Sequence, residues 1–65
     1  MLEQYEGRQV VVETENKRIF RGRVIDCCTS EENENSEESI IIRDVSTGML
    51  VELYAVDLES IEIVK

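Results

Sequence analysis

The sequence predicts an all-β domain, and three observations lead to that prediction. β-Branched residues recur with a period of two between short polar breaks, which is typical of half-buried strands. No long segment carries the i, i+3, i+4 apolar stripe of an amphipathic helix. The chain has 65 residues, so it is expected to form one domain, residues 1–65, whose core is small.

A single helical turn is expected at the N-terminus. Leu2 and Tyr5 are three residues apart, so one turn would lay both side chains on the sheet before Gly7 ends it. The expected strands then follow in order along the chain. They are Gln9–Thr14, Arg18–Asp26, Ile40–Val45, Met49–Tyr54 and about Glu59 to Val64.

The second expected strand has two distinct faces. Phe20, Gly22 and Val24 alternate onto one face, and Arg21 and Arg23 onto the other. A glycine in the middle of a strand weakens it unless the chain bends there or another backbone approaches closely. We therefore expect Gly22 to mark such a bend or close approach.

An acidic loop is expected at about residues 29–39, because residues 30–39 include no apolar side chain. It is either a solvated insertion or an acidic arm for a basic partner or a divalent cation. A calcium loop would need a ligand order and a turn glycine that this segment lacks. Five short strands, one long connection and tight turns elsewhere predict a strongly bent, five-stranded antiparallel barrel of the SH3-like or OB-like kind.

The charge and the aromatic content limit the ligands. Fifteen acidic residues against seven basic ones give a formal charge of −8, which repels nucleic-acid backbones and anionic membranes. One Phe, two Tyr and no Trp leave little surface for stacking. The first residues resemble no secretory signal and no apolar run is long enough to span a membrane, so we expect a cytoplasmic protein without a membrane partner.

Catalysis and metal binding are not expected. Cys27 and Cys28 are adjacent in a strand and would point to opposite faces, which argues against a simple disulfide or a shared metal site. The chain contains no His, no Cys in a credible nucleophile setting and no glycine-rich phosphate loop. We expect a non-enzymatic binding protein that needs no cofactor.

Two blocks of residues resemble the Sm and Sm-like family, which includes archaeal members and the bacterial host-factor protein. The second block is Leu53-Tyr54-Ala55 followed by Leu58 and Ile61, where the family has an Arg-Gly pair at Tyr54 and Ala55. The family's Met-Asn pair corresponds here to Thr29 and Ser30. The first block matches the family's spacing at Leu2, Gly7, Val10, Val12, Phe20, Gly22, Val24 and Asp26.

The resemblance implies a short helix on a five-stranded barrel whose fourth and fifth strands pair with neighbouring subunits in a ring. The implied subunit interface involves Val51, Leu53, Ile61 and Ile63. The resemblance also implies that single-stranded RNA lies around the pore. Its contacts would come from Asp26, Thr29, Ser30 and Tyr54, with Arg21 and Arg23 available to phosphates.

Each implied RNA contact has a structural alternative. Tyr54 would stack a base or would simply pack on the strand, and Asp26 would bind a base edge or backbone amides. Arg21 and Arg23 would contact phosphates or pair with carboxylates on neighbouring strands. The sequence thus predicts a homo-oligomeric module that binds single-stranded RNA or scaffolds a ribonucleoprotein, or else a protein-interaction scaffold that has lost RNA binding.

Overall fold

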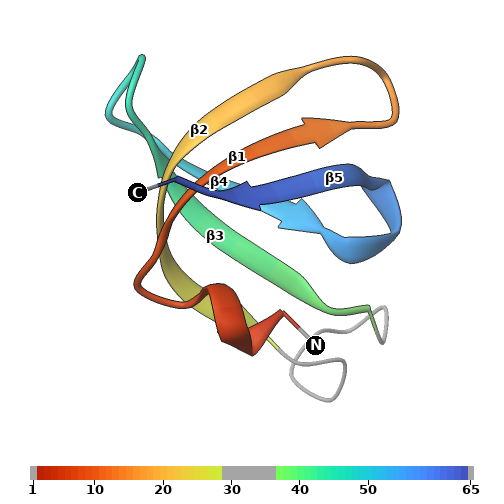
Figure 1. Ribbon diagram of the computed structural model, residues 1–65, viewed down its shortest axis with the longest axis horizontal. Coiled ribbons are helices and arrows are strands. Elements are labelled where there is room, and N and C mark those ends of the chain that lie inside the picture. Colours follow the sequence, from red (N-terminus) through yellow and green to blue (C-terminus); the bar gives the residue numbers. More distant parts are fainter. Residues whose placement is uncertain (1, 29–36, 65) are drawn as a thin grey trace.

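The all-β prediction is confirmed by the computed structural model, which describes residues 2–28 and 37–64 (Figure 1). Its five strands form one antiparallel sheet in the order β4-β3-β2-β1-β5. The expected N-terminal turn is the 3-10 turn η1, Glu3–Tyr5. The remaining elements are β1 Gln9–Thr14, β2 Ile19–Cys28, β3 Ser39–Asp44, β4 Leu50–Tyr54, η2 Ala55–Asp57 and β5 Leu58–Ile63.

The sheet is bent, because its two edge strands are consecutive in the chain. β4 and β5 lie at opposite edges and are joined only by the 3-10 turn η2. Such a turn spans roughly 8 Å, whereas the edges of a flat sheet of this size would lie about 19 Å apart. The sheet therefore curls until β4 and β5 approach each other at the η2 end (Figure 1).

Gly22 marks the close approach that its position in the strand predicts. A Cβ atom built on Gly22 would lie 1.9 Å from the carbonyl oxygen of Arg43 on β3. No side chain larger than hydrogen fits there unless one of the two backbones moves. This prediction is confirmed, and the contact fixes β2 against β3 at the middle of the sheet.

A bulge in β2 changes which residues face the core. The register of β2 against β3 shifts between Val24 and Asp26, so that Ile25 is the extra residue. Val24 is fully buried before the bulge, and Cys27 packs against the core after it. Ile25 and Asp26 are both exposed on the outer face.

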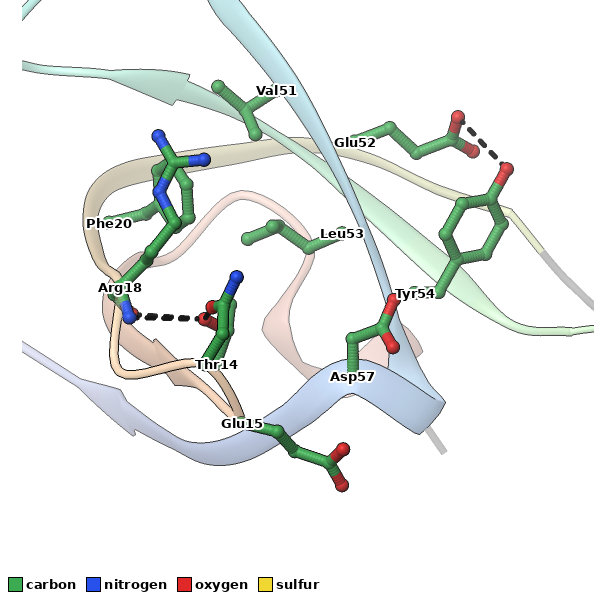
Figure 2. Close-up of a pocket in the computed structure, with 10 residues that line it drawn as sticks. Thr14, Glu15, Arg18, Phe20, Val51, Glu52, Leu53, Tyr54 and Asp57 are labelled. Atoms are coloured by element: carbon green, nitrogen blue, oxygen red, sulfur yellow. Dashed lines mark hydrogen bonds between the residues drawn. The ribbon is translucent and has the colours of Figure 1, made fainter.

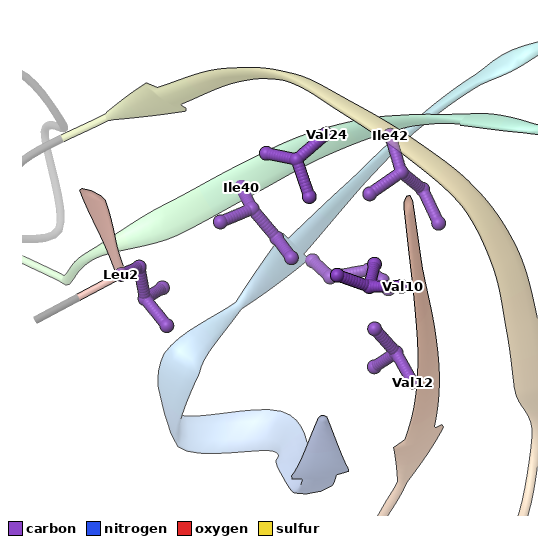
Figure 3. Packing of buried hydrophobic residues seen from close by; sticks show 7 residues of the cluster. Leu2, Val10, Val12, Val24, Ile40 and Ile42 are labelled. Atoms are coloured by element: carbon purple, nitrogen blue, oxygen red, sulfur yellow. The ribbon is translucent and has the colours of Figure 1, made fainter. Parts of the chain in front are cut away.

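The core fills the concave side of the sheet (Figure 3). It is aliphatic, as the shortage of aromatic residues requires. The turn η1 adds Leu2, whose backbone nitrogen donates a hydrogen bond of 3.1 Å to Oε1 of Glu38. Tyr5 packs against the same cluster from its rim. The buried members are Leu2, Val10, Val12, Val24, Ile40, Ile42 and Leu53.

Candidate binding faces and edges

The candidate RNA-binding residues that the structure describes lie on the outer, convex face of β2, β3 and β4; they are Arg21, Arg23, Asp26 and Tyr54. Pairing between the strands arranges this face in rows. Cys28, Ser39 and Tyr54 form the first row, and Asp26, Ile41 and Glu52 the second. Further along the strands, Arg23, Arg43 and Leu50 form another row. The face therefore has two ends, which differ in charge.

The tyrosine end is defined by Asp26, Ser39, Glu52 and Tyr54. Glu52 accepts a hydrogen bond of 2.8 Å from the hydroxyl of Ser39. It also accepts a long one, 3.5 Å, from the hydroxyl of Tyr54 (Figure 2). The negative charge of Glu52, followed by partial burial, raises the pKa of Tyr54 above its ordinary value. The polar side chains of Ser39, Glu52 and Tyr54 thus bond to one another.

Asp26 and its neighbours place limits on base recognition at the tyrosine end. Oδ1 of Asp26 accepts a hydrogen bond of 2.8 Å from the backbone amide of Cys27, as in the structural alternative for this residue. Thr29 and Ser30 lie outside the described residues. Every charged side chain that defines the tyrosine end is acidic, so this end offers no cation to a phosphate.

The arginine end is defined by Arg21, Arg23 and Arg43. Nη1 of Arg23 donates to the carbonyl oxygen of Gly7 at 2.8 Å, and Nη1 of Arg43 donates to that of Gly48 at 3.0 Å. Within residues 2–28 and 37–64, none of the three arginines forms an ion pair. The pairing with neighbouring carboxylates that the sequence left open is not found among the described residues.

A groove of about 460 Å³ runs between β4 and the β1–β2 hairpin (Figure 2). Val51 and Leu53 line it from β4, and Phe20 lines it from β2. The guanidinium carbon of Arg18 lies 5.3 Å from the centre of the Phe20 ring, as in a cation–π contact. Two of the four expected interface residues thus border this groove.

The other two expected interface residues lie on β5, at the opposite edge of the sheet. Ile61 is half-buried against the core and pairs with Val12. Ile63 pairs with Val10 but stays 40% exposed. β5 has a strand neighbour on one side only, and so has β4.

Comparisons with protein-family models, curated proteins and solved structures find no significant match to this chain. Two features of the described residues are also relevant to function. No helix in them is long and apolar enough to cross a membrane. Nor do three or more His, Cys, Asp or Glu side chains gather among them as a metal ion would require.

Sequence reasoning missed Arg43 as a partner of Arg23. Both stand at outward positions of alternating strands, which the period of two in Ile40–Asp44 already indicates. Their juxtaposition depends on the register between β2 and β3, which pairs distant segments of the chain. No motif in the neighbouring turns predicts that Arg23 and Arg43 are paired.

Proposed function

We propose that this chain is a non-catalytic, Sm-like module that assembles edge to edge and acts as a scaffold for other macromolecules. The observation that carries the proposal is the pair of open edges. β4 and β5 each have a single strand neighbour in the described sheet, and each presents partly exposed apolar residues. This strand order agrees with the resemblance, in which the fourth and fifth strands join neighbouring subunits.

Pairing between β4 of one copy and β5 of the next would satisfy the unpaired backbone groups of both edges. It would also bring Ile61 and Ile63 of one copy beside Val51 and Leu53, the apolar part of the groove of its neighbour. An interface between two different surfaces closes into a ring when the rotation per subunit permits. The added burial favours assembly, because seven buried hydrophobic side chains are a small core.

Light scattering after size-exclusion chromatography tests assembly. At tens of micromolar the wild type is expected to have a mass several times the 7.5 kDa of one chain. Ile63→Glu places a charge in the edge interface and is expected to give the single-chain mass. Ile19→Glu is the matched control, because Ile19 is 66% exposed on β2, away from both edges. A monomeric wild type would refute edge-to-edge assembly.

Short single-stranded RNA is the second candidate partner. Its support is Tyr54, which lies half-buried on the outer face at the position of the family's arginine. The carboxylates of Asp26 and Glu52 beside it, and a charge of −8 on every subunit, favour the protein scaffold instead.

Fluorescence anisotropy with labelled oligo-U and oligo-A, at low and physiological salt, separates the two candidates. If RNA is the partner, Tyr54→Ala is expected to weaken binding by about tenfold through the loss of stacking. Tyr54→Phe keeps the ring and is expected to keep the affinity. Absence of saturable binding at low salt would leave the protein scaffold.

A further inference from the structure

Large apolar side chains that are exposed to solvent surround the arginine end. Ile25 is 41% exposed, Leu50 53%, Val45 61% and Met49 66%. Exposed aliphatic groups around arginines are typical of surfaces that bind other proteins, where arginine is enriched and lysine is not. The tyrosine end has no comparable group of exposed aliphatic residues among those described.

Arg23 and Arg43 are directly opposite each other in the register of β2 and β3. Like charges in such a pair destabilise a sheet. Each guanidinium has five N–H donors and uses one nitrogen for a backbone carbonyl, so most donors remain for a ligand. The pair therefore lowers the stability of the isolated chain, and both arginines keep N–H donors for a ligand.

A hollow of about 450 Å³ lies at this pair. Arg23 and Arg43 supply charge to its lining, and Ile25 and Val45 supply apolar surface. A ligand that fills it must combine anionic and aliphatic groups. Carboxylates suit the guanidinium forks because both are planar and pair through two parallel hydrogen bonds.

We propose that the arginine end binds an acidic peptide segment of a partner protein, one in which aliphatic side chains alternate with carboxylates. Such a segment would place carboxylates on Arg23 and Arg43 and an aliphatic side chain against Ile25 and Val45. RNA fits the hollow less well, because no aromatic side chain lines it to stack a base.

This inference deepens the scaffold function by naming a class of partner, and it rests on that function for its biological use. It does not depend on assembly, because a single chain presents the whole arginine end. Peptide affinity and assembled mass are separate measurements, so either proposal can fail alone.

The test uses fluorescence anisotropy with a labelled synthetic peptide in which glutamates alternate with leucines. Saturable binding is expected, and the double variant R23Q/R43Q is expected to weaken it by about tenfold or more through the loss of charge-assisted hydrogen bonds. The matched control K17Q/R18Q removes the same charge from the hairpin and is expected to change affinity by less than about twofold. Peptides with glutamine for glutamate, or serine for leucine, are expected to bind more weakly.

Three outcomes would overturn the proposal. If R23Q/R43Q and K17Q/R18Q weaken peptide binding equally, the peptide is held only by general charge attraction. Tighter binding of oligo-U at the same arginines would assign the surface to RNA. A lower assembled mass of R23Q/R43Q would assign it to a second copy of the chain. Circular dichroism shows whether each variant is folded. If R23Q/R43Q is unfolded, R23K/R43K replaces it in the test, because lysine keeps the charge but lacks the planar guanidinium that pairs with a carboxylate through two hydrogen bonds.

Discussion

The two ends of the outer face are built on the same three strands and handle their polar groups in opposite ways. At the tyrosine end, Glu52 accepts hydrogen bonds from Ser39 and Tyr54, so the polar groups bond to one another. At the arginine end, Arg23 and Arg43 face each other without a carboxylate partner among the described residues. The tyrosine end makes its hydrogen bonds within one chain. The arginine end, as we propose, forms its ion pairs with a ligand.

The arrangement of both ends depends on the contact between β2 and β3, and Gly22→Ala is expected to disrupt that contact. The new Cβ would lie 1.9 Å from the carbonyl oxygen of Arg43, so the strands must separate. We expect a loss of about 3 kcal/mol in the free energy of unfolding, measured by urea denaturation. Peptide binding at the arginine end should fall with it.

Gly7→Ala is the matched control for that substitution. Gly7 has a φ of +79° with nothing within 4 Å of an added Cβ, so only backbone strain opposes alanine. Its expected cost is about 1 kcal/mol. Equal losses in the two variants would contradict the close contact at Gly22.

The pair of Arg23 and Arg43 has a smaller effect on the free energy of unfolding than Gly22→Ala, and changing it is expected to stabilise the fold. Arg43→Glu replaces a like-charge pair with an opposite-charge pair facing Arg23 and is expected to raise the free energy of unfolding by about 0.5 kcal/mol. Molar salt should shrink this gain by screening. Arg21→Glu changes the net charge equally but faces Val11, so it should show no such gain. Equal effects in the two variants would mean that the pair does not interact.

The smallest effect on stability is expected at the tyrosine end. Glu52→Gln removes the main cause of the raised pKa of Tyr54, so that pKa should fall toward its ordinary value of 10. Absorbance titration of tyrosinate in a Tyr5→Phe background measures it. An unchanged titration would mean that Glu52 does not act on Tyr54.

The same pKa shift predicts a dependence of stability on pH. Because the pKa of Tyr54 is higher in the folded than in the unfolded chain, its contribution to stability is complete below the ordinary value of 10. That contribution is lost as the pH rises through the folded value. Glu52→Gln should therefore reduce the loss of stability in alkali, which urea denaturation across this range measures.

Local patterns predict the strands and their faces well. The period of two places Phe20, Gly22 and Val24 inward and Arg21 and Arg23 outward, as the structure has them. The glycine in the middle of β2 predicts the close approach of β3. These features depend on neighbours in the sequence, which is why they can be read from it.

Features that depend on pairing between distant segments are not accessible in the same way. The bulge at Ile25 extends β2 to Cys28, two residues beyond its expected end at Asp26. The register between β2 and β3 also brings Arg43 opposite Arg23, whereas the sequence singled out only Arg21 and Arg23. No local signal specifies a register that is set by packing across the sheet.

Titration of ¹⁵N-labelled protein with the glutamate–leucine peptide, followed by backbone amide chemical shifts, shows which end of the outer face binds the peptide. If the arginine end binds the peptide, the amides of Ile25, Arg43 and Val45 are expected to shift in a saturable way, while those of Glu52 and Tyr54 stay in place. Shifts gathered around Tyr54, or no saturable shifts at all, would contradict it.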